Sequence, residues 1–366
     1  MSKHIVIAAG GTGGHLFPAQ SLACELQASG DAKILFLAKG LTANPRFNRD
    51  LYAYKDIASG PINANVKTLI FSSWNILKGT LQSILALKKF KADVVIGFGS
   101  YHSFPVLCAA KIMGIPIVLH EANSVPGKVN RIFSPYAAWT GVFFPDASKY
   151  LKGKVQPTDI PLRAEFYEHK KPNKKQAAAY YGLSDDATTI LVFGGSLGAK
   201  KLNELAAASI CQLHKTNLQV LHFTGAIEAS KHIQHQYLQA GITAVVREFE
   251  QQMPYAWALA DVCVSRSGAS SIAEAVSFMV PTVYIPYPYA TDAHQDKNAK
   301  YIVDVIKGGL WYPERDLTAD VLMKAIDTLL AQENAQAIKK GLKDAQMTMQ
   351  SNRFSDLVTA YLGNNP

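Results

Sequence analysis

The sequence predicts an α/β protein made of two doubly wound parallel-sheet domains that face one cleft. A β-branched apolar run meets clustered glycines and then helical apolar spacing twice, at residues 4–26 and at residues 189–207. Strand-like runs alternate with helical patterns after each of these turns, which is typical of a parallel sheet covered by helices. Each glycine turn brings backbone N–H groups to a helix N-terminus, where a phosphate is favoured. The pattern indicates an enzyme that binds a nucleotide.

Length and composition fit this fold class. The 366 residues suit two domains, and 48% hydrophobic with 18% charged residues indicates a globular chain. The net charge of +9 favours phosphates, nucleic acid or an anionic membrane as partners. Nucleic acid is disfavoured because no helix-turn-helix, zinc-finger or RNP signature is present. The four cysteines are widely spaced without a ligand pattern, so we expect apolar filler residues in a reducing compartment.

The expected elements follow in order along the chain. Expected strands occupy residues 5–9, 34–37, 94–96 and 115–119, then 190–193, 220–223, 244–246, 262–264 and 282–285. Expected helices include 20–27, 104–112, 318–331, 335–349 and 354–362. Residues 153–175 are rich in proline, lysine and charge and predict a linker. No apolar stretch reaches 18 uninterrupted residues and residues 5–9 are too short for a signal peptide, so we expect a cytoplasmic protein without a transmembrane helix.

The glycine turns argue against two common nucleotide sites. The first turn, AGGTGGH at residues 9–15, departs from the GxGxxG fingerprint of nicotinamide-binding domains. Such domains place an acid at the end of the second strand for the ribose hydroxyls, whereas this strand ends at Lys39. No GK[ST] follows any glycine cluster, which excludes a P-loop.

Two later segments combine turns with polar side chains. In CVSRSGASSIAEA, residues 263–275, Ser265 or Ser267 is expected to cap a helix that begins near Gly268. Glu274 then lies about two turns into that helix, where its carboxylate can accept hydrogen bonds from sugar hydroxyls. The segment at residues 287–299 follows an expected buried strand and is crowded with polar side chains, namely Asp292, His294, Gln295, Asp296 and Asn298.

Five motifs in this order resemble those of the MurG family of bacterial glycosyltransferases. They are GGTGGH at 10–15, HEAN at 120–123, GGSLGA at 194–199, RSGASSIAE at 266–274 and HQDKNA at 294–299. The resemblance spans essentially the whole chain and implies the GT-B fold, with two Rossmann-like domains. It places an acceptor- and membrane-facing domain at residues 1–160 and a UDP-GlcNAc-binding domain at 161–349. Residues 350–366 are expected to form a helix that packs back on the first domain.

The resemblance also implies an activity in peptidoglycan synthesis. Members of the family invert the anomeric centre as they move N-acetylglucosamine from UDP-GlcNAc to the C4 hydroxyl of undecaprenyl-pyrophosphoryl-MurNAc-pentapeptide, at the cytoplasmic face of the inner membrane. No cofactor is required, and the absence of a DxD sequence argues against a metal. The alternatives are another GT-B enzyme, with a different lipid acceptor or a UDP-sugar epimerase activity, and a catalytically inactive membrane-associated scaffold that binds a UDP-sugar.

Donor-binding residues are carried over by position. The resemblance assigns the diphosphate and sugar to Thr12, Gly13, Gly14, Asn123, Arg163, Ser196, His294 and Gln295, and the nucleoside to Ala269, Ser270, Ser271, Ile272, Ala273 and Glu274. It assigns recognition of uracil to the backbone at Glu250, where the family commonly has an apolar residue. Ser100 and Phe104 stand where the family usually has glycines near the acceptor.

His15 is the candidate general base, because it follows the glycine turn and titrates near neutral pH. The alternative is a histidine that merely packs at a helix start. His120 and Glu121 of the HEAN motif are the reserve candidates.

Residues 68–91 predict a membrane-facing segment. Apolar side chains precede a lysine cluster, which suits an anionic membrane surface: Phe71, Trp74, Ile76, Leu77, Lys88, Lys89 and Lys91. We expect this segment to dock on the membrane without spanning it. The alternative is a core-facing helix with solvated lysines.

Overall fold

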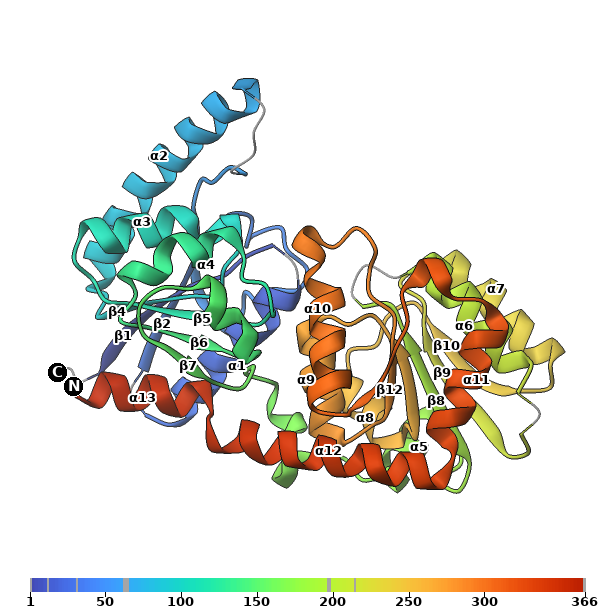
Figure 1. Cartoon of the computed structure of the whole chain (residues 1–366). Coiled ribbons are helices and arrows are strands. Elements are labelled where there is room, and N and C mark those ends of the chain that lie inside the picture. Colours follow the sequence, from blue (N-terminus) through green and yellow to red (C-terminus); the bar gives the residue numbers. More distant parts are fainter. Residues whose placement is uncertain are drawn as a thin grey trace. The chain divides into compact units, whose positions relative to one another are not determined.

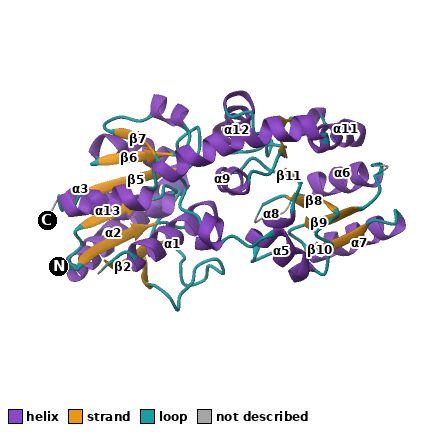
Figure 2. Ribbon diagram, turned by 90° about the horizontal axis from the view of Figure 1, so that it is seen from below, coloured by secondary structure: helices purple, strands orange, loops and turns teal. Residues whose placement is uncertain are grey.

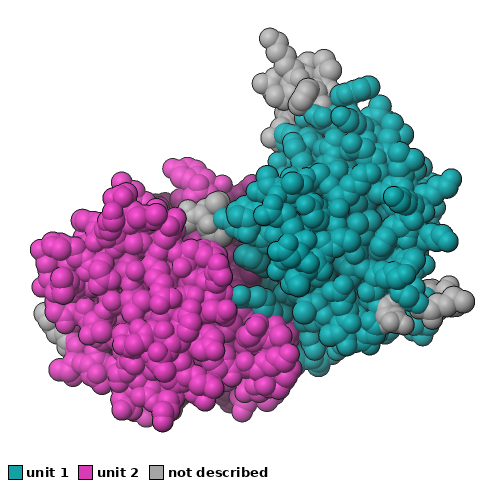
Figure 3. All heavy atoms as spheres, turned by 180° about the vertical axis from the view of Figure 1, so that it is seen from behind, with its two compact units in different colours: residues 1–163, 349–366 teal, residues 164–348 magenta. Residues whose placement is uncertain are grey.

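The structure is a computed structural model that describes residues 2–11, 13–30, 32–61, 66–195, 199–213 and 215–364, with the backbone alone for residues 66–71. The chain divides into two compact units, which Figure 3 colours separately. Unit 1 consists of Met1–Arg163 and Met349–Pro366, and unit 2 consists of Ala164–Thr348.

Unit 1 is built on a seven-stranded parallel sheet with the order β3-β2-β1-β4-β5-β6-β7 (Figure 1). Its inner strands β4 and β5 contain only buried residues, because packed elements cover both faces of the sheet. The edge strand β3 is mostly exposed. The strands are β1 (Lys3–Ala8), β2 (Ala32–Ala38), β3 (Ala53–Asp56), β4 (Val94–Gly97), β5 (Ile117–Glu121), β6 (Trp139–Val142) and β7 (Val155–Pro157).

Alternate side chains of β1 belong to two different cores. Ile5 and Ile7 pack in a cluster that includes residues of α1 and α13, whereas Val6 and Ala8 pack in a cluster that includes residues of α2 and α3. Helices therefore cover both faces of the sheet, as Figure 1 shows; Figure 2 gives the same elements from below, with helices in purple and strands in orange. The helices of unit 1 are α1 (Gly13–Ala28), α2 (Val66–Phe90), α3 (Phe104–Ile112), α4 (Lys128–Phe133) and α13 (Phe354–Asn364).

Unit 2 repeats the architecture with a six-stranded parallel sheet of order β10-β9-β8-β11-β12-β13. The strands are β8 (Thr188–Phe193), β9 (Leu218–Phe223), β10 (Thr243–Arg247), β11 (Val262–Ser265), β12 (Thr282–Tyr284) and β13 (Gly309–Trp311). The helices are α5 (Lys174–Tyr181), α6 (Lys200–Cys211), α7 (Ile227–Gln239), α8 (Met253–Leu259), α9 (Ala269–Phe278), α10 (His294–Lys300), α11 (Ala319–Leu330) and α12 (Gln332–Ser351), which runs across the boundary between the units.

Each sheet has one point at which the order of its strands reverses. In unit 1 the chain moves outward from β1 in one direction and from β4 in the other, and in unit 2 the same reversal falls between β8 and β11. At such a point the loops that follow two neighbouring strands run to opposite faces of the sheet. A crevice then opens between the loops, at the carboxyl ends of the two strands. Both glycine turns lie at these switch points, since they follow β1 and β8.

The last helix of the chain belongs to the core of unit 1. Phe354 is fully buried in the same cluster as Ile5 and Ile7. Its backbone N–H donates to the carboxylate of Asp159 at 2.8 Å, and the N–H of Asp159 donates to the carbonyl oxygen of Asn352 at 3.0 Å. These bonds tie α13 to the chain beyond β7.

The structure confirms the predicted fold class and the nine predicted strands, with small shifts at their ends. The linker predicted at residues 153–175 is wrong in part. Val155–Pro157 forms the edge strand β7, which pairs with β6, and α5 begins at Lys174. Proline and lysine are tolerated there because an edge strand has one unpaired side.

Candidate functional site

The first glycine turn connects β1 to α1 at the switch point of unit 1. The side-chain amide of Asn44 holds the turn by donating to the carbonyl oxygen of Gly11 at 2.9 Å. Gly11 has a φ of +89°, in the left-handed region that favours glycine. Gly13 is buried and Gly14 is exposed at the start of α1, whereas Thr12 lies outside the described residues. The first N–H groups of α1 have no partners within the helix and can therefore bind an anion.

His15 lies in the first turn of α1, where its orientation is fixed by the neighbouring strand. Its Nδ1 is 2.7 Å from the carbonyl oxygen of Phe98, which directly follows β4. A carbonyl oxygen only accepts, so Nδ1 carries the proton in the neutral ring and Nε2 is the basic nitrogen. The side chain is half-buried. This tautomer is the one that a general base acting through Nε2 requires.

His120 is a core residue of β5. Its Nε2 donates to the carbonyl oxygen of Asp159 at 2.9 Å, and its ring packs edge to face on Phe354 and against Phe98. Burial lowers the pKa of His120 to about 4, so the ring stays neutral at pH 7. Phe98 therefore contacts both histidines, with its carbonyl oxygen on His15 and its ring on His120. The geometry of His120 fits a structural role better than proton transfer.

Glu121 shapes the loop that follows β5. Its buried carboxylate accepts hydrogen bonds from the backbone N–H groups of Asn123 and Gly127, at 2.9 Å and 3.0 Å, and from the side chain of Asn130 at 2.8 Å. Burial raises the pKa of Glu121, and these donors oppose the rise. The contacts place Asn123 at the carboxyl edge of the sheet. Arg163, by contrast, is exposed at the end of the first segment of unit 1.

At the switch point of unit 2, the loop after β11 is clamped by Arg266. This guanidinium, 9% exposed, pairs with Glu314 at 2.5 Å and donates to the carbonyl oxygens of Ile285 and Pro286. The clamp joins the loops that follow β11 and β12. On the other side of the switch point, Ser196 of the second glycine turn lies outside the described residues.

The cap predicted for α9 is wrong. Gly268 is the N-cap residue, and no side chain caps the helix. The hydroxyl of Ser267 instead donates to the carbonyl oxygen of Gln295 at 2.8 Å, and the hydroxyl of Ser265 donates to the carbonyl oxygen of Arg266. The first turn of α9 also contains no acidic residue. Its N–H groups are therefore not satisfied by a side-chain cap, which is the arrangement that suits a bound phosphate.

The predicted nucleoside segment forms the first two turns of α9. Ala269, Ile272 and Ala273 are buried, whereas Ser270, Ser271 and Glu274 are half-buried. The hydroxyl oxygen of Ser270 is buried without a hydrogen-bond partner among the described residues. The indole N–H of Trp257, in α8, donates to the carboxylate of Glu274 at 2.8 Å. This bond fixes the orientation of the carboxylate at the start of α9.

Gln295 and His294 begin α10 beside this segment. The side-chain oxygen of Gln295 accepts from the backbone N–H of Tyr287 at 2.8 Å, and Nδ1 of His294 lies 2.7 Å from the carbonyl oxygen of Thr291. The side chain of Asn298 donates to the carbonyl oxygen of Ser267 at 3.2 Å. The structure thus brings the two polar segments predicted from the sequence together at one edge of the sheet in unit 2.

Glu250 is buried, although it occupies a loop after β10. Its carboxylate accepts from Arg247 at 2.6 Å and from the backbone N–H of Gln252 at 2.7 Å, and the hydroxyl of Tyr180 lies at 3.4 Å. The guanidinium of Arg247 also lies over the ring of Tyr181, 5.1 Å from its centroid. The charge of Glu250 is therefore satisfied within the protein.

Helix α2 carries its large apolar residues on the outside. Trp74, Leu77, Leu81 and Leu85 are 64%, 53%, 56% and 67% exposed, at spacings of three and four residues that place them on one face. The opposite face is buried and consists largely of small residues: Ser72, Gly79, Thr80, Ser83 and Ala86. Leu87 near the end of the helix is buried in the core, but four large apolar side chains lie on the exposed face, which a soluble amphipathic helix normally fills with polar residues. We call the four exposed residues the α2 stripe.

The other residues predicted to face the membrane are distributed around this stripe. Ile76 is half-buried and the three lysines Lys88, Lys89 and Lys91 are exposed, whereas the side chain of Phe71 lies outside the described residues. The alternative of a core-facing apolar side is wrong for Trp74 and Leu77. No helix among the described residues is long and apolar enough to cross a membrane.

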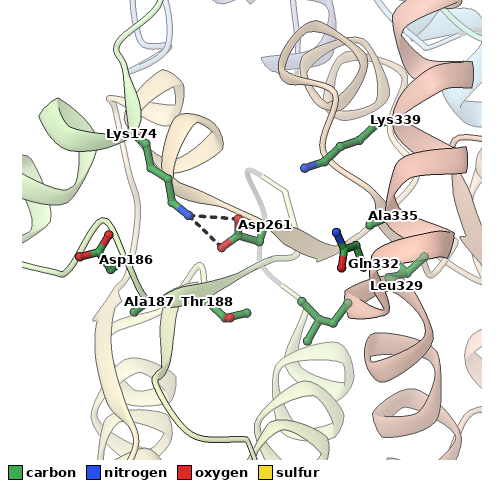
Figure 4. Close-up of a pocket in the computed structure, with 10 residues that line it drawn as sticks. Lys174, Asp186, Ala187, Thr188, Asp261, Leu329, Gln332, Ala335 and Lys339 are labelled. Atoms are coloured by element: carbon green, nitrogen blue, oxygen red, sulfur yellow. Dashed lines mark hydrogen bonds and ion pairs between the residues drawn. The ribbon is translucent and has the colours of Figure 1, made fainter.

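A cavity of about 280 Å³ lies at the opposite end of the sheet in unit 2 (Figure 4). It is lined by residues that precede β8 and β11 and by residues of α12, among them Asp186, Asp261 and Lys339. Lys174 spans part of it and pairs with Asp261 at 3.1 Å. The cavity is therefore remote from the carboxyl ends of the strands. Within the described ranges, no group of three or more His, Cys, Asp or Glu side chains is placed to hold a metal ion.

Three residues that hold segments of the site in place were not predicted from the sequence to do so. Arg266 lies within a recognised motif, but its partner Glu314 is 48 residues away. Trp257 and Asn44 orient functional segments from other elements, and no local pattern in the sequence marks them. A long-range side-chain contact leaves no trace in the spacing of residues.

Comparison with known proteins places the chain in one family. It matches the glycosyltransferase family 28 N-terminal domain over residues 5–142 and the glycosyltransferase family 28 C-terminal domain over residues 189–358. The UDP-N-acetylglucosamine–N-acetylmuramyl-(pentapeptide) pyrophosphoryl-undecaprenol N-acetylglucosamine transferase of Protochlamydia amoebophila is 45% identical over 332 residues, which are 90% of this chain and 88% of the relative. The enzyme of the same name from Chlamydia pneumoniae is 34% identical, with 93% of each chain covered.

A solved structure supports the same relationship. The crystal structure of MurG from Acinetobacter baumannii matches with a TM-score of 0.76 and 28% identity, and the match covers 98% of this chain and 99% of that one. The two parallel sheets with their helices have the GT-B architecture.

The Arg266 clamp yields a stability prediction. Glu314→Ala leaves a buried guanidinium without its carboxylate, which costs about 3–5 kcal/mol of unfolding free energy. Amide hydrogen exchange of peptides from β11 and β12 should speed up, because the clamp joins the loops that follow these strands. Arg315→Ala is the matched control, since that side chain is 85% exposed. Equal exchange in the two variants would contradict the role of the clamp.

Proposed function

Because the chain belongs to glycosyltransferase family 28, we propose that it transfers N-acetylglucosamine from UDP-GlcNAc to the C4 hydroxyl of undecaprenyl-pyrophosphoryl-MurNAc-pentapeptide, converting lipid I to lipid II in peptidoglycan synthesis. The observation that carries the proposal is the 45% identity to an enzyme of this name over nine tenths of the chain. A hexosyltransferase of this kind needs one site for a nucleotide sugar and one for a hydroxyl nucleophile. Each unit has a switch point with a glycine turn, which provides two such places.

We assign the donor to the switch point of unit 2. The uncapped N-terminus of α9 favours the diphosphate, and the carboxylate of Glu274 suits the ribose hydroxyls. Gln295 and His294 supply hydrogen-bonding groups for the sugar. We assign recognition of uracil to the backbone at Glu250, and we carry over Arg163 and Asn123 as donor-binding residues on the family resemblance alone. Backbone amides suit the binding of the diphosphate and of uracil because they are fixed before the ligand arrives and lose no side-chain entropy.

We assign proton abstraction to His15. The bond to the carbonyl oxygen of Phe98 sets the tautomer in which Nε2 takes the proton of the acceptor hydroxyl as the oxygen attacks the anomeric carbon. The bond between that carbon and the diphosphate breaks in the same step, so UDP leaves from the opposite face and the configuration inverts. Helix N-terminal amides and Arg163 stabilise the departing charge, and no cofactor or metal is required.

We further propose that unit 1 docks on the cytoplasmic face of the inner membrane through the α2 stripe. An exposed row of Trp and Leu side chains costs free energy in water and gains it in the interfacial region of a bilayer. Lys88, Lys89 and Lys91 lie at and beyond the end of the same helix, where they attract anionic headgroups. The lipid anchor of the acceptor would then lie in the same surface. The net charge serves this contact, and we assign no nucleic acid partner.

One assay tests the activity itself. The purified chain, supplied with labelled UDP-GlcNAc and lipid-linked MurNAc-pentapeptide, should produce a lipid-linked disaccharide and UDP in equal amounts. UDP-GlcNAc without the acceptor should remain intact, which separates a transferase from an epimerase because an epimerase would convert the free donor. Binding of UDP without any turnover would instead identify an inactive scaffold.

His15→Ala should lower kcat by about 10²–10⁴-fold, because the acceptor hydroxyl loses its base. Affinity for UDP measured by calorimetry should stay within about twofold of the original. His120→Asn provides the comparison, since its defect should appear in thermal stability rather than in the transition state. Turnover of His15→Ala at the original rate would remove this residue from the mechanism.

Trp74→Ser combined with Leu81→Ser should weaken sedimentation with phosphatidylglycerol vesicles by at least about tenfold, because the protein loses two exposed apolar side chains that would enter the bilayer interface. The fold should be unaffected, as both side chains are exposed. Leu238→Ser in α7, where the side chain is 70% exposed, is the control in unit 2 and should bind like the original. Unchanged binding of the double variant would contradict docking through the α2 stripe.

A further inference from the structure

A serine occupies a backbone conformation that serine normally avoids, at the switch point of unit 1. Ser100 has φ of +68° and ψ of +146°, a region that only glycine enters at low cost. It follows Gly99, which also has positive φ, in the loop that leaves β4. Residues with such strain persist only where the surrounding structure holds them.

The surrounding hydrogen bonds hold this loop firmly. The hydroxyl of Ser103 donates to the carbonyl oxygens of Gly99 at 2.7 Å and Ser100 at 2.8 Å. The hydroxyl of Ser59 donates to the carbonyl oxygen of Tyr101 at 2.7 Å. The hydroxyl of Ser100 is 2.7 Å from Nδ1 of His102, and the ring of Tyr101 stacks on that imidazole with centroids 4.0 Å apart.

The Ser100–His102 pair lies directly against the first glycine turn. A Cβ added to Gly10 would lie 2.9 Å from Cβ of His102, and one added to Gly11 would lie 3.0 Å from Cε1 of its ring and 3.4 Å from the hydroxyl oxygen of Ser100. The same loop contains Phe98, whose carbonyl oxygen orients His15. The pair therefore lies at the switch point of unit 1, in the same loop as the carbonyl oxygen that orients the candidate base.

The imidazole of His102 is neutral at pH 7. Burial lowers its pKa to about 4, and the charges of Lys39 and His15 act in the same direction. A neutral ring uses Nδ1 either to donate to the serine oxygen or to accept its proton. In both cases this bond, together with the backbone N–H of His102 that donates to the same oxygen at 3.4 Å, holds the serine oxygen in place, and the hydroxyl retains capacity for a further hydrogen bond. The strained serine is thereby a pre-oriented polar group.

We propose that Ser100, positioned by His102, makes a hydrogen bond to an oxygen of the lipid-linked acceptor at this switch point. Ser100 is then a binding residue for the acceptor and His102 is its positioning residue. The inference rests on the proposed function, since it assigns a contact within the same acceptor site. Strain at Ser100 is the cost of placing a hydroxyl where glycine would be more stable.

Ser100→Gly tests the proposal because stability and binding should change in opposite directions. The variant should melt at a higher temperature, since relief of the strain exceeds the entropy gained by the unfolded chain. KM for the acceptor should rise about 3- to 20-fold, as expected for one lost hydrogen bond. KM for UDP-GlcNAc should be unchanged, and kcat at saturating acceptor should stay within about twofold. His102→Leu should reproduce the rise in acceptor KM.

Lys307→Gly is the matched control, because it relieves a positive φ of 60° in unit 2. It should leave every kinetic constant unchanged. Inorganic pyrophosphate, used as a competitor against the acceptor, identifies the oxygen. A weaker inhibition constant in Ser100→Gly assigns the contact to the diphosphate, and an unchanged one assigns it to the sugar.

A Ser100→Gly variant with unchanged acceptor KM would overturn the proposal and leave Ser100 as a residue that the loop merely tolerates. Failure of the proposed function is a separate result, because the original chain would then form no disaccharide lipid at all.

Discussion

The reversal of strand order in each parallel sheet is the constraint on which the site depends. Parallel pairing sends every β–α loop to the carboxyl edge, and the reversal makes two neighbouring loops diverge to opposite faces. The crevice at that edge is therefore a consequence of topology before any side chain is considered. In unit 1 the reversal brings the turn after β1 next to the loop after β4. The carbonyl oxygen of Phe98, in the loop after β4, therefore orients His15, which follows the turn after β1.

Buried charges in this protein shape loops, and the groups assigned to chemistry lie at the surface of those loops. Glu121 accepts hydrogen bonds from three residues of the loop and helix that follow β5, and Arg266 joins two loops through Glu314 and main-chain carbonyl oxygens. A buried ion is expensive unless each lone pair and proton is satisfied, so such a group can hold only one loop conformation. That property makes it suitable for presenting backbone amides in a fixed geometry.

The sequence was sufficient for the fold and for the segments of the site, but not for their internal contacts. Buried parallel strands are continuous apolar runs, so every strand predicted from such a run was confirmed. Four short strands were not predicted, namely β3, β6, β7 and β13, and β7, with lysine and proline beside it, was read as linker. Helix caps were harder, because Ser267 could bond either to the start of α9 or to Gln295, and only the packing of α10 decides between them. The orientation of α2 was also undetermined, since the periodicity of an apolar stripe does not say whether it faces a core or solvent.

The departure at Glu250 shows how a charged residue can replace an apolar one without exposing its charge. Arg247 neutralises the carboxylate, Tyr180 contacts it, and the N–H of Gln252 bonds to it two residues further along the chain. The last bond closes the turn around Glu250 and so restricts the backbone on either side. An apolar side chain would restrict the same backbone only by packing. The charge is thus turned toward the protein. The backbone contact with uracil that we propose at this position would depend on the turn that the carboxylate closes, because main-chain groups recognise a ligand only when their direction is fixed.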